Sequence, residues 1–177
     1  QMVGEKSKKV ITEKSARRIE SALRLPDYWL DQERDAYGKP VGKNVAVIGA
    51  GGIGFDVSEF LTHSGTSASQ DAPKFYAEWG IDTRYANVGG LAEPHVEAAP
   101  RKVALLQRKT SKVGDQLGKT TGWIHRTGLK AKRVGMYPGV QYQKIDDAGL
   151  HIRVGDDERV LNVDNVMSTA EISQMGQ

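Results

Sequence analysis

A glycine-rich turn is the part of this 177-residue chain whose residue types and spacing best suit a chemical role. The sequence GAGGIG, residues 49–54, follows a short apolar run, VAVI, and leads into a stretch with a helical pattern. This strand–turn–helix order is typical of dinucleotide sites, where the turn and the helix N-terminus receive a pyrophosphate. We therefore predict that the cofactor-binding residues include Gly49, Gly51, Gly52 and Gly54. The alternative is a glycine-rich turn that binds nothing.

A basic segment follows the second predicted strand. The apolar residues 102–106 run into Gln107-Arg108-Lys109-Thr110-Ser111-Lys112, which contains no acid. NAD sites carry an acidic residue near this position for the ribose hydroxyls, whereas an arginine accommodates the 2′-phosphate of NADP. Asp71 lies at the nominal spacing for such an acid, but no strand precedes it. We therefore predict NADPH rather than NADH, with the 2′-phosphate held by Arg108, Lys109 and Lys112.

Positive charge is concentrated in one window of the chain. Residues 101–133 contain ten Lys or Arg and one acid, so this window carries +9, whereas the whole chain carries +3 and the remainder −6. Such a region attracts a polyanion. A solvated basic face and a nucleic-acid site are the alternatives, but the only aromatic residue here is Trp123 and no nucleic-acid-binding module is recognisable. We expect no nucleic-acid partner.

The segment LGKTTGWIHR, residues 117–126, lies inside this window. Its GKT triplet does not form a P-loop motif, because Val113 occupies the position of the first glycine and no strand leads in. His125 has no partner at a suggestive spacing and is expected to be an ordinary helical residue. Trp123 offers a flat surface for a ring or an acyl group and is a candidate substrate-proximal residue, with burial as the alternative. The sequence identifies no catalytic residue and no metal site.

The order of the elements predicts an α/β fold. We expect a Rossmann-like parallel sheet with helices on both faces, plus a three-stranded antiparallel β-meander. The meander comes from alternating strands at 140–145, 150–154 and 159–163, separated by Asp- and Gly-rich turns, and one more strand at 163–167 would return to the parallel sheet. About thirty residues with a short helix at 74–79 are inserted before the second strand, too many for a structureless loop.

Composition narrows the class of protein further. No segment has the apolar length of a membrane span, and the N-terminal residues lack the apolar core of a signal peptide. The chain contains no cysteine, which excludes disulfides and cysteine-ligated iron–sulfur clusters within it. We therefore expect a cytoplasmic protein without a membrane partner.

Four runs resemble one enzyme family, over about residues 40–166: VGKNVAVIGAGGIGFDVSEFL, FYAEWGID, LLQRKTSKVGDQLGKTTGWIHRTGL and PGVQYQKIDDAGLHI. They are similar to the bacterial NADPH-dependent 2,4-dienoyl-CoA reductases, which are old-yellow-enzyme-like flavin and iron–sulfur oxidoreductases. The resemblance implies a glutathione-reductase-like NADPH domain that passes hydride to FAD. Electrons then reach FMN through the cluster and reduce a dienoyl-CoA thioester in fatty-acid β-oxidation. It also implies that the four glycines meet the pyrophosphate, the three basic residues meet the 2′-phosphate, and Trp123 lies near cofactor or substrate.

The ends of the chain depart from this family. Residues 1–39 form a polar segment with one expected helix at 15–25, and residues 168–177 form a tail in place of the family's flavin-closing segment. We predict the NADPH-binding domain at 40–167, with a flavin domain in cis or trans as partner. FAD, FMN and an iron–sulfur cluster are expected only in a full-length homologue. The alternative is an isolated, non-catalytic NADPH-binding module or a truncated fragment, and Arg108 and Lys109 disfavour a nucleotide-fold methyltransferase.

Overall fold

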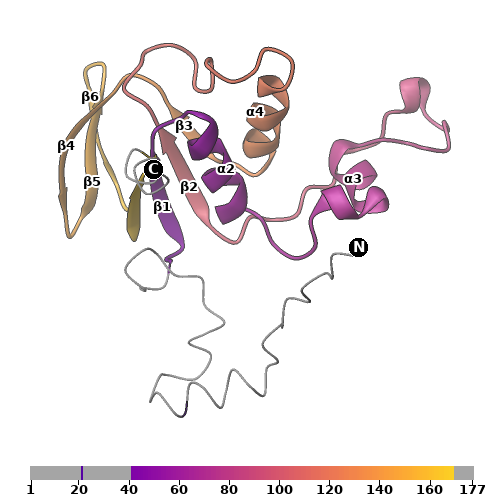
Figure 1. Ribbon diagram of the computed structural model, residues 1–177, viewed down its shortest axis with the longest axis horizontal. Coiled ribbons are helices and arrows are strands. Elements are labelled where there is room, and N and C mark those ends of the chain that lie inside the picture. Colours follow the sequence, from indigo (N-terminus) through magenta and orange to yellow (C-terminus); the bar gives the residue numbers. More distant parts are fainter. Residues whose placement is uncertain (1–20, 22–40, 170–177) are drawn as a thin grey trace, which may run out of the picture. The chain divides into compact units, whose positions relative to one another are not determined.

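A parallel sheet organises the computed structural model, which describes residue 21 and residues 41–169 (Figure 1). Its strands follow the order β3-β2-β1-β7, with β1 at Asn44–Ile48, β2 at Lys102–Leu106, β3 at Gly135–Tyr137 and β7 at Asn165–Ser168. The pairing of β1 with β2 runs in register from Asn44 opposite Lys102 to Ile48 opposite Leu106. The carboxyl ends of these two strands therefore lie side by side at one edge of the sheet.

Two helices cover one face of this sheet. Helix α2 (Gly52–Leu61) contacts β1, β2 and helix α4 (Gly122–Ala131) (Figure 1). Side chains alternate between the faces of a strand, so Val45 and Val47 of β1 point to the same face. Both are buried, as is Phe55 of α2. A Cβ added to Gly54 would lie 3.3 Å from the Leu105 side chain, which shows how closely α2 approaches β2.

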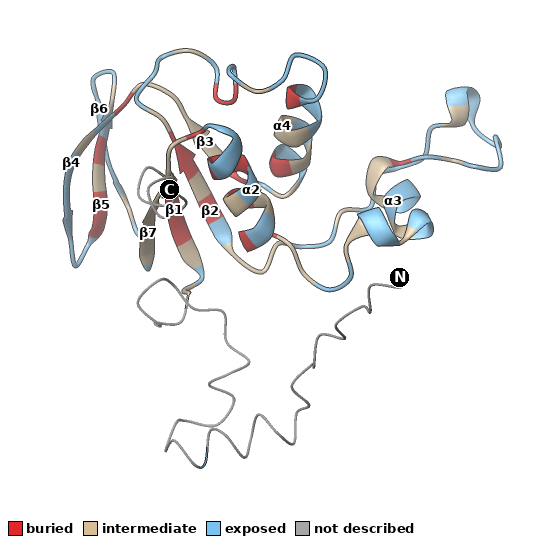
Figure 2. Cartoon of the chain, viewed as in Figure 1, coloured by how far each residue is buried: buried red, intermediate tan, exposed pale blue. Residues whose placement is uncertain are grey.

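An antiparallel meander covers the opposite face. Strands β4 (Val140–Asp146), β5 (Gly149–Val154) and β6 (Asp157–Leu161) form a second sheet in that order. Leu150 and Ile152 of β5 join Ala46 and Leu106 of the parallel sheet in one buried cluster (Figure 2). The predicted combination of parallel sheet, helices and three-stranded meander is confirmed. The expected placement of helices on both faces differs from the structure: α2 and α4 share one face, and the meander covers the other because Leu150 and Ile152 of β5 pack there.

The inserted segment between α2 and β2 is ordered, as its length led us to expect. It contains a 3₁₀ turn η2 (Ala68–Gln70), helix α3 (Ala72–Trp79), a second 3₁₀ turn η3 (Val88–Gly90) and an antiparallel bridge between Ile81 and Leu91. Asp71 precedes α3 and accepts a hydrogen bond from the Lys74 amide at 3.1 Å. Asp71 is therefore a helix cap rather than an acid at the end of a strand.

Two further findings concern the extent of the described chain. The predicted helix at 15–25 lies outside the described residues, apart from Ser21, which is helical. Among the residues that the structure describes, no helix combines the length and the apolar character needed to traverse a bilayer.

The packing of the meander generates a stability prediction. Replacing Ile152, whose side chain is fully buried, by Ala should lower the free energy of unfolding by about 2–5 kcal/mol, because a cavity would open between the two sheets. Ile145→Ala on the neighbouring strand is the matched control, since that side chain is 64% exposed, and should cost less than about 1 kcal/mol. Urea unfolding followed by circular dichroism measures both. Equal losses would contradict this assignment of the core.

Candidate functional site

The candidate site lies where β1 ends. The amide of Gly49 donates a hydrogen bond to the Leu106 carbonyl at 2.8 Å, which extends the β1–β2 ladder by one residue. Gly49 then takes a φ of 109°, a backbone conformation that residues other than glycine rarely adopt. The Thr169 hydroxyl donates to the Ile48 carbonyl at 3.1 Å and occupies the space that a Cβ on Gly49 would need. Hydrogen bonds to the end of β2 and from Thr169 therefore fix the point at which the turn leaves the sheet.

The remaining glycines of the turn fall into two kinds. A Cβ on Gly54 would lie 1.8 Å from the Gly49 carbonyl oxygen, so the turn and the first turn of α2 can close only around a glycine. Gly51 and Gly52 are exposed, and a Cβ on either would meet nothing within 4 Å. Gly51 caps α2 without any side-chain hydrogen bond to the helix N-terminus. The first amides of α2 thus have no side-chain cap, and such a helix N-terminus can receive an anion.

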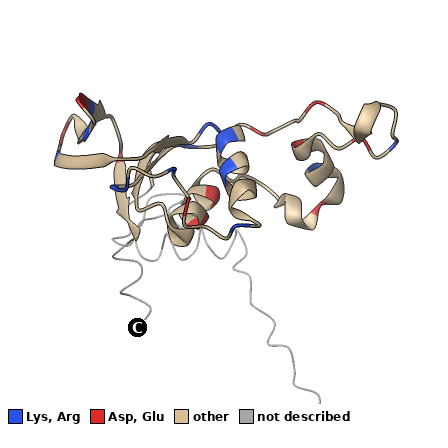
Figure 3. Cartoon of the chain, turned by 90° about the horizontal axis from the view of Figure 1, so that it is seen from above, with Lys and Arg blue, Asp and Glu red and all other residues tan. Residues whose placement is uncertain are grey.

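The predicted basic residues follow β2 at the same edge of the sheet. Arg108, Lys109 and Lys112 are exposed, and none of them forms an ion pair with a residue that the structure describes. Figure 3 colours the basic and acidic positions along the backbone. Ile48 pairs with Leu106, so the glycine turn starts one residue beyond this pair and Arg108 lies two residues beyond it. The structure therefore brings the glycine turn and this basic loop together, although they are far apart in the sequence.

Tyr142 of β4 is a neighbour of Arg108 that no sequence pattern indicates. Burial raises the pKa of the Tyr142 phenol, while the positive charge of Arg108 acts in the opposite direction. Its hydroxyl is buried and has no hydrogen-bond partner among the described residues. Tyr142 is therefore a partly buried ring that packs against the cluster between the two sheets and lies near Arg108.

Not every cation of the basic window is available to a ligand. The Arg126 guanidinium donates to the Gly114 carbonyl at 2.9 Å, and Arg101 donates to the Leu61 carbonyl at 3.5 Å. Gly114 itself packs against the Phe55 ring, since a Cβ at this position would lie 2.6 Å from that ring. The loop between β2 and α4 is therefore held against α2, and these two arginines have structural roles.

Trp123 and His125 both lie on α4. The Trp123 side chain is 54% exposed, and its ring meets Trp79 of α3 edge-on with centroids 6.5 Å apart. His125 is helical, as expected, and its Nδ1 lies 2.7 Å from Oε1 of Glu59 on α2. In this structure Trp123 contacts the inserted segment, and His125 links the two helices that cover the sheet.

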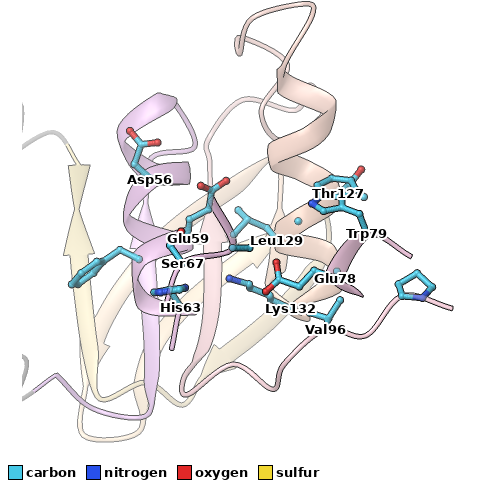
Figure 4. A pocket seen from close by; sticks show the side chains of 15 residues that line it. Asp56, Glu59, His63, Ser67, Glu78, Trp79, Val96, Thr127, Leu129 and Lys132 are labelled. Atoms are coloured by element: carbon cyan, nitrogen blue, oxygen red, sulfur yellow. The ribbon is translucent and has the colours of Figure 1, made fainter. Parts of the chain in front are cut away.

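A concave region lies on the helix side of the domain, away from the glycine turn and the basic loop. It is a groove of about 640 Å³ between α2, α4 and the inserted segment (Figure 4). Its lining combines the apolar side chains of Trp79 and Leu129 with the charged side chains of Glu59, Glu78 and Lys132. In the described part of the chain, no group of three His, Cys, Asp or Glu side chains is arranged to hold a metal ion. The mixture of charges in this groove does not define one class of ligand, so the strand edge is the stronger candidate.

Comparison with known proteins gives partial likenesses. No protein-family model matches the chain. Similar solved structures include a 2-naphthoyl-CoA reductase in complex with 2-naphthoyl-CoA (TM-score 0.48, 16% identity) and a bacillithiol disulfide reductase from Bacillus cereus (0.46, 14%). A third is an engineered water-forming NADPH oxidase bound to NADPH (0.38, 14%). The matches cover 71–72% of this chain but only 14%, 28% and 20% of those three chains, respectively.

The two kinds of glycine can be separated by experiment. Gly54→Ala should lower the melting temperature by several degrees, because its Cβ would overlap the Gly49 carbonyl. Gly52→Ala is a substitution of the same size two residues earlier, at the first residue of α2, and its Cβ would contact nothing. It should leave the free energy of unfolding unchanged or raise it by about 0.5–1 kcal/mol. Thermal unfolding compares the two variants. A stable Gly54→Ala variant would show that the close approach of the turn and α2 is wrong.

Proposed function

We propose that this chain binds NADPH at the carboxyl edge of its parallel sheet. The observation that carries this proposal is the register of β1 and β2, which places the glycine turn beside the basic loop. Ligands of open α/β sheets bind outside the carboxyl ends of the strands, which is where both segments lie. The open space around Gly51 and Gly52 is what a bound phosphate requires.

Each group of residues has a separate task in this proposal. Gly51, Gly52 and the free amides of α2 would hold the pyrophosphate, because a helix N-terminus favours negative charge. Arg108 would bind the 2′-phosphate through its planar guanidinium, with Lys109 and Lys112 adding charge. When bound, NADPH supplies the hydride. The described residues of this chain bind and orient the nucleotide.

The acceptor of the hydride would lie on a flavin domain. The sequence resemblance to the 2,4-dienoyl-CoA reductases supports FAD in cis or trans, with a dienoyl-CoA thioester as the final substrate. Since the chain has no cysteine, ligands for an iron–sulfur cluster would have to come from another polypeptide segment. The alternative is a module that holds NADPH without an electron acceptor of its own. Flavin absorbance that co-purifies with the chain would favour the enzyme, and its absence with intact NADPH binding would favour the module.

The basic loop generates a prediction of nucleotide preference. The double variant Arg108→Ala/Lys109→Ala should bind NADPH at least about 100-fold more weakly than the parent chain, because each charge-assisted phosphate contact contributes about 1.5–3 kcal/mol. Its affinity for NADH should change by no more than a few-fold, since NADH has no 2′-phosphate. Nucleotide fluorescence titrations measure both dissociation constants.

The control for this variant is Lys144→Ala/Arg153→Ala. It removes the same charge from two exposed residues of the meander, which pair with Asp146 and Glu158. NADPH affinity should be retained in this control. Equal affinities of the parent chain for NADPH and NADH would refute the proposed preference.

A further inference from the structure

One side chain at the end of β2 organises the basic loop without being charged. The Gln107 amide nitrogen donates to the Lys109 carbonyl at 3.0 Å and to the Ser111 carbonyl at 2.6 Å. An amide group carries two N–H donors, so these two bonds use the full donor capacity of the side chain. Gln107 is half-buried, whereas Arg108 and Lys109 beside it are exposed. The side-chain amide of Gln107 therefore holds the loop backbone at two points, the Lys109 and Ser111 carbonyls.

Main-chain hydrogen bonds hold the same loop from its other side. The Gly139 amide donates to the Lys109 carbonyl at 2.8 Å, and the Val140 amide donates to the Gln107 carbonyl at 2.9 Å. The carbonyls of residues 107, 109 and 111 are thus all bonded within the protein. These hydrogen bonds hold the loop backbone that carries the basic side chains before any ligand arrives.

A preformed loop binds an anion more tightly than one that must first be ordered, because the ordering entropy has already been spent in folding. Removal of the Gln107 side chain would free the Ser111 carbonyl and would leave the Lys109 carbonyl with the Gly139 amide as its hydrogen-bond donor. A Ser111 carbonyl oxygen turned toward the ligand would also oppose the 2′-phosphate electrostatically. Loss of the Gln107 side chain should therefore weaken the binding of NADPH, which carries the 2′-phosphate, and not the binding of NADH.

We infer that Gln107 is a positioning residue that determines nucleotide specificity, because it holds the loop of Arg108, Lys109 and Lys112 in a form ready for a 2′-phosphate. This inference rests on the proposed NADPH site. Gln107 itself contacts main-chain carbonyls and acts on the ligand through its neighbours.

The test compares NADPH and NADH affinities of the full chain for Gln107→Ala and Gln107→Glu. Gln107→Glu keeps the size of the side chain but places acceptor oxygens against two carbonyl oxygens. Gln143→Ala is the matched control, because Gln143 is exposed on β4 and its side chain donates only to the Glu158 carboxylate among the described residues. We expect both Gln107 variants to lower the preference for NADPH over NADH by about tenfold, while NADH affinity stays within about twofold and the control is unchanged.

Three results would overturn the inference. An unchanged preference in both Gln107 variants would show that the amide does not position the cations. Equal losses of affinity for both nucleotides would show damage to the fold rather than to specificity. A parent chain without any preference would overturn the proposed NADPH site and this inference together, whereas the first two results leave the proposed function intact.

Discussion

The hydrogen bond from the Gly49 amide to the Leu106 carbonyl sets the geometry on which the site depends. It is the last hydrogen bond of the parallel β1–β2 ladder, so both strands end at the same edge of the sheet and the segments that follow them start there. One chain becomes the turn that needs glycine at Gly49 and Gly54, and the other becomes the loop that carries Arg108 and Lys109. An antiparallel pairing would have sent the two segments to opposite edges of the sheet. The candidate site is thus a consequence of strand direction and register.

The meander contributes to this site although its strands lie outside it. Its β4 strand starts with Val140, whose amide bonds to Gln107, while Gly139 bonds to Lys109. The same strand places Tyr142 near Arg108. Packing of Leu150 and Ile152 on the face of the sheet opposite α2 therefore fixes the connection that shapes the basic loop. Core packing and ligand geometry are coupled through a few main-chain hydrogen bonds.

Patterns local in sequence could be predicted, and contacts made by tertiary packing could not. The glycine turn, β2 and the meander each have an apolar period or turn residues of their own, and the structure confirms them. By contrast, the bounds of the helix at Gly122–Ala131 could not be predicted, although His125 is expected to be helical, because Gly122 and Gly128 weaken the helical propensity of this segment. Strand β3 has three residues, too few to show alternation. The pair His125–Glu59 spans 66 residues and leaves no local signal, and Thr169, assigned to the predicted tail, supports the glycine turn.

The central claim is that one nucleotide bridges the glycine turn and the basic loop. Amide chemical-shift perturbation by NMR, with NADPH titrated into the isotopically labelled chain, tests it most directly. The account predicts that the largest shifts fall on residues 49–54 and 107–112 together, at one common dissociation constant. Shifts confined to the groove around Trp79 and Lys132, or no shifts at millimolar NADPH, would contradict it.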